Sequence, residues 1–190
     1  ALVALDVGPG DEVIVPSHTF IATWLAVSQC GATPVPVDPT EEGFNIDPQR
    51  VAARITPKTK GIIPVHLYGE PVDLDPLIDL ANRHGLFVLE DAAQAHGAIY
   101  QGRRIRSHGH AVAWSFYPGK NLGAFGDGGA VSTQDEALAR RIRILGNYGS
   151  RTKYVNDVIG YNSRLDPLQA AILRAKLPRL DEWNARRHAI

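Results

Sequence analysis

Short apolar runs alternate with stretches of helical periodicity along this chain. The runs at residues 11–16, 33–37, 61–67, 86–89, 111–115 and 129–132 have the length and composition of strands. Between them, apolar residues recur at helical spacing, and this alternation is typical of a mainly parallel sheet with flanking helices. The pattern therefore predicts an α/β fold in one continuous domain, since no repeat, low-complexity tract or flexible linker interrupts it.

Caps and prolines mark where the helices begin and end. Three Asp-Pro pairs place an N-cap acid before a proline suited to the first turn, which predicts helices at residues 48–55, 76–84 and 167–176. Residues 19–30 form a mostly apolar helix that Gly31 ends, which makes Cys30 a buried helix residue. Residues 133–136 resemble a capping box and open a further helix.

Composition and charge narrow the classes of function. The 20 Lys and Arg residues balance 20 Asp and Glu residues, so no global field favours nucleic acid or an anionic membrane surface. No apolar run approaches the roughly 20 residues that span a bilayer. The single cysteine cannot build an intrachain disulfide framework, which fits a reducing compartment. These features predict a cytoplasmic protein that binds neither nucleic acid nor membrane.

Both ends of the chain have the pattern of interrupted helices. Residues 1–5 resemble the tail of an apolar helix, and residues 180–187 resemble a helix that stops in mid-course. The 190 residues include no methionine, so an initiator is missing as well. We therefore expect the chain to be a fragment of a longer polypeptide.

The strongest chemical signal is a lysine and an acid that each follow a predicted strand. Lys120 lies on a Gly/Pro turn after residues 111–115, and Asp91 stands at the carboxyl end of residues 86–89. Ligands of open α/β sheets bind beyond such strand ends. A lysine that forms a Schiff base and a carboxylate that keeps a pyridine nitrogen protonated together suggest a pyridoxal 5'-phosphate (PLP) site.

Each of these residues also has a simpler interpretation. Asp91 alone fits the N-cap of a helix that begins at Ala92, and Lys120 alone fits a solvated surface lysine. Considered together they favour the cofactor site, since a partly desolvated lysine beside a cationic ring has its ammonium form disfavoured.

Other residues could complete such a site. The hydroxyl of Ser115, with neighbouring backbone amides, could receive the cofactor phosphate, and the Gly-rich turn at 126–129 permits a close backbone approach. Phe20 could stack on the pyridine ring, with core packing as the alternative. No G-x-G-x-x-G motif follows the first strand, which argues against a dinucleotide-binding domain.

The histidines and one loop have open roles. We expect His66 and His96 to be satisfied structural histidines near strand ends, and His108 with His110 lacks the further donors of a metal site. No metal is predicted. Residues 149–164 lack periodicity and mix aromatic with charged residues, which fits an ordered binding loop, a subunit contact or plain solvated surface.

Six segments of the chain resemble the DegT/DnrJ/EryC1/StrS sugar aminotransferases, which are fold-type I PLP-dependent enzymes. They are residues 10–16, 19–23, 64–69, 90–97, 115–122 and 160–165. The resemblance implies a three-layer α/β/α architecture in which residues 1–190 form most of the PLP-binding large domain. It also implies that the family's N-terminal Gly-Thr phosphate-binding segment and C-terminal small domain are absent, so the isolated fragment is expected to lack a complete site and activity.

The same resemblance assigns roles to individual residues. It implies that Lys120 carries the Schiff base, that Asp91 pairs with the ring nitrogen and that Gln94 contacts the ring hydroxyl. Phe20 would stack on the ring and Ser115 would bind the phosphate. In a homodimer, Asn162 would reach the phosphate of the cofactor bound to the neighbouring subunit.

The reaction implied by the resemblance is transfer of an amino group from glutamate to a nucleotide-linked keto sugar. Residues 116–123, 126–129 and 147–154 look like the branch that aminates C3 of a dTDP-3-keto-6-deoxyhexose. One alternative is a PLP-dependent sugar dehydratase, in which histidine replaces the lysine, so Lys120 argues against it. Another is a catalytically silent fold-type I homologue that acts as a subunit or regulator.

Overall fold

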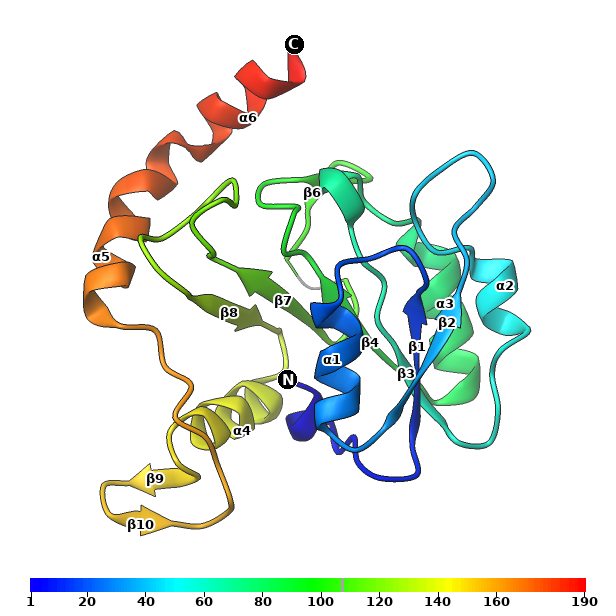
Figure 1. Cartoon of the computed structure of the whole chain (residues 1–190), viewed down its shortest axis with the longest axis horizontal. Coiled ribbons are helices and arrows are strands. Elements are labelled where there is room, and N and C mark those ends of the chain that lie inside the picture. Colours follow the sequence, from blue (N-terminus) through cyan, green and yellow to red (C-terminus); the bar gives the residue numbers. More distant parts are fainter. Residues whose placement is uncertain (107) are drawn as a thin grey trace.

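The central sheet has six strands in the order β2-β1-β3-β4-β7-β8 (Figure 1). The computed structural model describes residues 1–106 and 108–190. The strands are β1 (Glu12–Pro16), β2 (Thr33–Val37), β3 (Thr59–Ile62), β4 (Phe87–Asp91), β7 (Ala111–Ser115) and β8 (Gly129–Ser132). All neighbouring strands pair parallel except β7 and β8, which pair antiparallel. The predicted mainly parallel α/β sheet is therefore confirmed.

Helices cover both faces of this sheet. The α-helices are α1 (Ala22–Gln29), α2 (Pro48–Ala52), α3 (Leu74–His84), α4 (Glu136–Gly146), α5 (Pro167–Lys176) and α6 (Leu180–His188). Ile14 of β1 packs in one core cluster with side chains of α2 and α3. Its neighbours Val13 and Val15 pack in the opposite cluster with side chains of α1 and α4, because successive strand residues point to opposite faces. The result is the expected three-layer arrangement.

Short elements complete the chain. They are the 3₁₀ helices η1 (Leu2–Leu5), η2 (Leu67–Gly69) and η3 (Leu177–Arg179), and the two hairpins β5 (Ile99–Tyr100) with β6 (Arg103–Arg104) and β9 (Ser150–Thr152) with β10 (Val155–Asn156). The apolar helical tail expected for residues 1–5 is the short 3₁₀ helix η1. In Figure 1, α5 and α6 continue from one another, orange to red, as an arm outside the layers of the sheet. None of the helices among the described residues is long and apolar enough to cross a bilayer.

Two predicted helix starts are wrong by a few residues. The N-cap of α3 is Asp73 rather than Asp75, whose backbone N–H instead bonds the Tyr100 hydroxyl at 3.1 Å. The N-cap of α4 is Asp135, which accepts hydrogen bonds from two backbone N–H groups of its first turn. Thr133 lies outside that helix and donates its hydroxyl to the His110 carbonyl.

Other boundaries also differ from the sequence pattern. α1 begins at Ala22 instead of residue 19, and Cys30 is its half-buried C-cap rather than a buried helix residue. α2 ends at Ala52 instead of residue 55. β3 spans Thr59–Ile62 instead of 61–67, since Pro64 has no N–H with which to continue the ladder.

Candidate active site

The carboxyl ends of the parallel strands meet at one edge of the sheet, and a cavity of about 980 Å³ opens there. Asp91 ends β4, Ser115 ends β7, and both line this cavity. Asn162 and Thr23 line it from the loop before α5 and from α1. Three of the six predicted site residues, Asp91, Ser115 and Asn162, therefore share one cavity.

The carboxylate of Asp91 is held by two hydrogen bonds. Oδ2 accepts from the Thr23 hydroxyl at 2.9 Å, and Oδ1 accepts from the backbone N–H of Ala93 at 3.0 Å. No helix begins at Ala92, because the chain there runs through turns, so the N-cap interpretation of Asp91 is wrong. Thr23 was missed from the sequence, because nothing local distinguishes its hydroxyl from that of Ser28 on the same helix.

Ser115 stands where β7 turns away from the sheet. Its Oγ accepts from the backbone N–H of Tyr117 at 3.3 Å, and the Phe116 N–H bonds the Gly128 carbonyl at 2.7 Å. Both of these amides are engaged, so the hydroxyl hydrogen of Ser115 is the group of this turn that is available to donate to a phosphate.

Phe20 and Gln94 lie outside the residues that line the cavity. Phe20 exposes 68% of its surface, so the core-packing alternative is wrong and the ring is free to stack on a ligand. Gln94 Oε1 accepts from the backbone N–H of Tyr68 at 2.7 Å. Since that oxygen is engaged, the side-chain amide N–H₂ of Gln94 is the group that can donate to a ligand oxygen.

Lys120 faces a different cavity, of about 490 Å³, in contact with the arm formed by α5 and α6. Its backbone N–H bonds the Tyr117 carbonyl at 2.9 Å, which closes a turn beyond the end of β7. The side chains of Lys176, Trp183 and Arg187 line this second cavity with it. The structure thus does not place Lys120 among the residues that line the cavity of Asp91.

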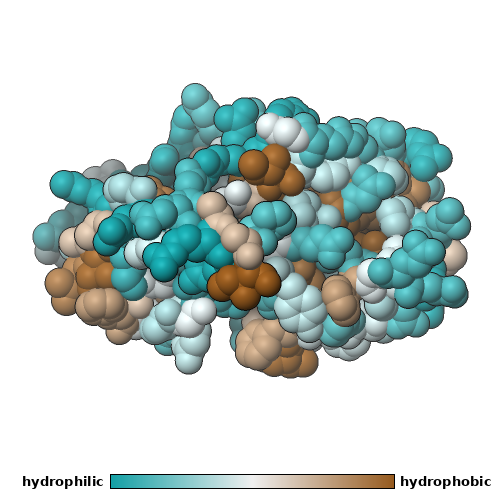
Figure 2. Space-filling model, turned by 90° about the horizontal axis from the view of Figure 1, so that it is seen from above, coloured by the Kyte–Doolittle hydropathy of each residue, from teal (hydrophilic) through white to brown (hydrophobic). Residues whose placement is uncertain are grey.

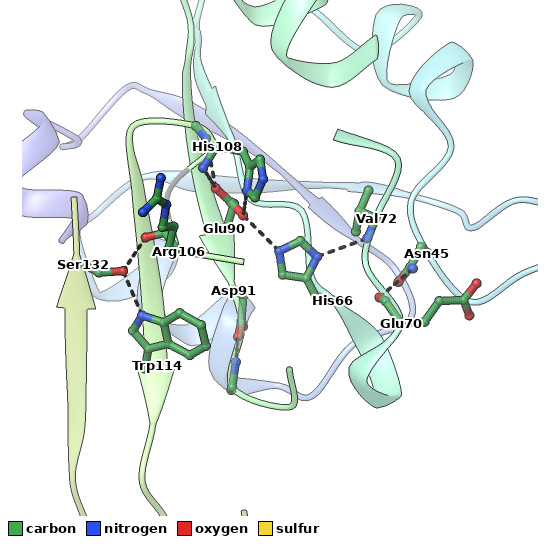
Figure 3. A network of polar contacts seen from close by, with 12 residues as sticks. Asn45, His66, Glu70, Val72, Glu90, Asp91, Arg106, His108, Trp114 and Ser132 are labelled. Atoms are coloured by element: carbon green, nitrogen blue, oxygen red, sulfur yellow. Dashed lines mark hydrogen bonds and ion pairs between the residues drawn. The ribbon is translucent and has the colours of Figure 1, made fainter. Parts of the chain in front are cut away.

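Behind Asp91, on the other side of β4, lies a buried polar network (Figure 3). His66 and Glu90 are fully buried, and His66 Nε2 lies 3.1 Å from Glu90 Oε2. His66 Nδ1 accepts from the Val72 N–H at 3.1 Å, so Nε2 carries the proton donated to Glu90. His66 is therefore the satisfied structural histidine that was expected.

The second oxygen of Glu90 is also occupied. Oε1 accepts from the backbone N–H groups of His108 and Gly109 at 2.7 and 2.9 Å. Burial raises the pKa of Glu90, but the hydrogen bonds from His66, Gly109 and His108 outweigh it and hold the pKa below its ordinary value. The carboxylate is consequently kept ionised in the core.

His96 contradicts the expectation of a satisfied histidine. It is 4% exposed, and its ring packs 5.4 Å from Trp114 and 5.9 Å from Phe116, centroid to centroid. Neither ring nitrogen has a hydrogen-bond partner among the described residues. Burial lowers the pKa of His96, and the positive charge of Lys120 lowers it further. The Ser115 carbonyl favours the protonated ring and offsets only part of this lowering. The folded protein therefore favours a neutral imidazole.

This burial predicts a pH-dependent stability. The pKa of His96 is lower in the folded state, so the unfolded chain takes up the proton first as the pH falls through about 6.5. The folded state is therefore fully stable with respect to His96 above that pH, and it loses stability below it, where protonation favours the unfolded chain. We expect the melting temperature to fall between about pH 7.5 and about pH 5.5, and His96→Phe to flatten that fall. The exposed His188→Gln is the matched control, and an unchanged slope in His96→Phe would contradict the prediction.

His108 and His110, which alternate in the sequence, do not form part of a metal site among the described residues. His110 Nδ1 accepts from the Val88 N–H at 3.1 Å. Across residues 1–106 and 108–190, no three His, Cys, Asp or Glu side chains are grouped as a metal site would need.

The loop at residues 149–164 is an ordered hairpin with exposed hydrophobic side chains. Tyr154 exposes 88% and Ile159 exposes 94% of its surface. At the neck of this loop the backbones of Gly149 and Gly160 meet so closely that neither position has space for a Cβ. Figure 2 shows that hydrophobic side chains gather in separate patches on an otherwise largely hydrophilic surface. The hairpin's exposed apolar side chains favour a contact surface over plain solvated surface.

Comparisons with known proteins agree on one family. The sequence model of the DegT/DnrJ/EryC1/StrS aminotransferase family matches residues 1–190. The dTDP-3-amino-3,4,6-trideoxy-alpha-D-glucose transaminase of Streptomyces venezuelae is 62% identical over 190 residues, which are 100% of this chain and 50% of that protein. The chain thus spans about half the length of this curated relative.

Solved structures give the same answer. The crystal structure of S. venezuelae DesV in complex with a ketimine intermediate matches with a TM-score of 0.97 and 62% identity, over 99% of this chain and 51% of that one. The structure of ntda from Bacillus subtilis with bound cofactor PMP matches with a TM-score of 0.85 and 40% identity, over 90% of this chain and 39% of that one.

Proposed function

This chain belongs to the DegT/DnrJ/EryC1/StrS aminotransferase family, and from that membership we propose that its parent protein is a PLP-dependent transaminase. The parent protein moves an amino group from glutamate to a nucleotide-linked keto sugar, namely to C3 of a dTDP-3-keto-6-deoxyhexose. The observation that carries the proposal is the shared cavity of Asp91, Ser115 and Asn162 at the carboxyl edge of the sheet. The 62% identity to a named dTDP-sugar transaminase supports the choice of sugar.

The residues of the cavity fit PLP. Asp91, fixed by Thr23 and Ala93, offers a carboxylate to a protonated ring nitrogen, and the Ser115 hydroxyl offers a donor to a phosphate. When bound, PLP supplies an electron sink and a carrier for the amino group.

Three further side chains have roles around the ring. The exposed ring of Phe20 would stack on its face, and the side-chain N–H₂ of Gln94, whose oxygen is already engaged, would donate to its hydroxyl oxygen. Lys120 would hold the cofactor covalently and would move the proton at the substrate carbon that bears the amino group.

The parent protein is also proposed to be larger and dimeric. Residues 1–190 form most of its cofactor-binding large domain, with the N-terminal phosphate-binding segment and the small domain outside this chain. Asn162 is exposed at the cavity and the neighbouring hairpin carries exposed aromatic residues, which supports a contact with a second copy. A cytoplasmic location is proposed from the lone Cys30.

Incubation of the full-length protein with PLP, glutamate and a panel of dTDP- and UDP-linked keto sugars tests the function. We expect 2-oxoglutarate and an amino sugar to form, with dTDP-linked 3-keto substrates giving the largest kcat/KM. Cofactor binding without transfer to any of the sugars would instead identify a catalytically silent relative. Loss of water from the sugar without consumption of glutamate would identify a dehydratase.

Asp91→Asn is expected to lower kcat by about 10²–10³-fold, because a neutral amide cannot hold the ring nitrogen protonated. The fold is expected to remain intact, since Asn still accepts the hydrogen bond from Thr23 or Ala93. Thr23→Ala is the graded control, with a loss of about tenfold, because it removes one hydrogen bond from a neutral hydroxyl to the carboxylate. Steady-state rates decide, and Asp91→Asn with unchanged kcat would contradict the role of Asp91.

A further inference from the structure

The loop that follows Lys120 is held by the α5–α6 arm. Side chains of the arm bond alternate residues of this loop: Asn184 Oδ1 accepts from Asn121 Nδ2 at 3.0 Å, Lys176 Nζ donates to the Gly123 carbonyl at 2.6 Å, and Gln169 Oε1 accepts from the Phe125 N–H at 2.8 Å. The loop at residues 121–125 is therefore held in place by the α5–α6 arm, which lies outside the layers of the sheet.

Asn184 also bonds a second segment. Its Nδ2 donates to the His96 carbonyl at 2.7 Å, while its Oδ1 accepts from Asn121. His96 lies five residues after Asp91 and two after Gln94, and Asn121 is the neighbour of Lys120. One side-chain amide therefore joins the segment that carries Asp91 to the turn that carries Lys120.

The backbone is shaped for this contact. Gly97 has a φ of +86°, and a Cβ at that position would lie 2.7 Å from Asn184 Nδ2. Glycine thus lets α6 approach closely enough for the bond to His96. Asp181, one turn earlier on α6, forms a two-pronged ion pair with Arg104 at 2.8 and 2.7 Å.

Apolar contacts complete the docking of the arm. Leu122 and Ala124 of the loop pack with Leu173 of α5 and Leu180 of α6 in a cluster apart from the two main cores. The turn around Lys120 is exposed at residues 117–119, so the arm supplies much of its support.

We propose that Asn184 is a positioning residue, which holds Lys120 in register with the segment that carries Asp91 and Gln94. The proposal rests on the proposed function, since it gives the arm a part in the placing of the reactive amine. A displacement of the order of 1 Å at a reacting group can cost about 10²-fold in rate, so a single link between the two segments has a large effect.

Hydrogen exchange in the cofactor-free full-length protein tests the link without reference to activity. In Asn184→Ala, the backbone amides of residues 119–126 are expected to exchange at least about five times faster than in the unsubstituted full-length protein, because two hydrogen bonds are lost. Asp181→Ala is the matched control. It removes the ion pair with Arg104 from the same helix, and it is expected to leave exchange at residues 119–126 unchanged.

The second measurement is the rate at which Lys120 captures added PLP, followed by the absorbance of the bound cofactor. Asn184→Ala is expected to slow capture and lower kcat by about tenfold or more, with little change in KM for glutamate. Faster exchange with an unchanged capture rate would show that Asn184 has only a structural role, and it would overturn the proposal. Unchanged exchange at residues 119–126 would overturn it as well.

Two further outcomes keep the tests separate. If Asn184→Ala does not fold, Asn184→Asp decides by the same comparison, because it still accepts from Asn121 but cannot donate to His96. If the full-length protein captures PLP but transfers no amino group, the proposed function is wrong. The exchange and capture rates of the Asn184 variants still test whether Asn184 positions Lys120.

Discussion

Lys120→Ala in the full-length protein is expected to abolish amino transfer, with a loss of kcat of at least about 10³-fold. The variant lacks the amine that we propose binds the cofactor covalently and moves the proton, and no other lysine is among the described residues that line the cavity of Asp91. Its fold is expected to persist, since Lys120 Nζ makes no hydrogen bond with any of the described residues. Turnover of glutamate and borohydride trapping of bound PLP are the two measurements.

Lys58→Ala is the control for Lys120→Ala, because Lys58 is an exposed lysine remote in sequence from the predicted site. It is expected to keep both the rate and the trapped cofactor. Transamination retained by Lys120→Ala would refute the assignment of Lys120. A folded parent protein that traps no PLP would refute the cofactor as well.

Glu90→Ala is expected to destabilise the protein by about 3–5 kcal/mol, because it removes the acceptor of the fully buried His66 imidazole and of two partly buried backbone N–H groups. Urea unfolding of the full-length protein measures the loss. Glu136→Ala is the control, since that side chain is 93% exposed and its removal is expected to cost less than about 0.5 kcal/mol. A loss below about 1 kcal/mol in Glu90→Ala would contradict the prediction that the hydrogen bonds of Glu90 stabilise the fold.

The same substitution has a pH signature. The pKa of Glu90 is lowered by folding, so its contribution to stability is present above the unfolded value of about 4.3 and is lost as the pH falls through the folded value. The difference between the parent protein and Glu90→Ala should therefore shrink in acid. An unchanged difference at low pH would show that the ionised form of Glu90 is not what stabilises the core.

Local signals were enough to predict much of the fold. The helix at Pro167–Lys176 and the strand at Thr33–Val37 have the predicted bounds, because a proline at the first turn and a short β-rich run are local features. The start of α3 was wrong because Asp73 and Asp75 are equivalent by type. Tyr100, from a distant hairpin, bonds the Asp73 carboxylate with its hydroxyl and accepts the Asp75 N–H.

Only part of the candidate site could be predicted in the same way. Asp91 and Ser115 meet because parallel strands bring their carboxyl ends to one edge, which is a consequence of topology. Glu90 was not recognised as a core residue, since its burial depends on His66 and on a loop beyond it. Asn184 could not be found at all, because its two partners lie 88 and 63 residues away along the chain.

The narrow neck of the hairpin loop makes its shape depend on two glycines. Because the backbones of Gly149 and Gly160 meet, the two ends of residues 150–159 lie together, and the segment forms a hairpin separate from the central sheet. A larger residue at either glycine would force these two ends apart, since the backbones leave no space for a Cβ. The surface that the hairpin presents to its surroundings would then change, although neither glycine belongs to that surface.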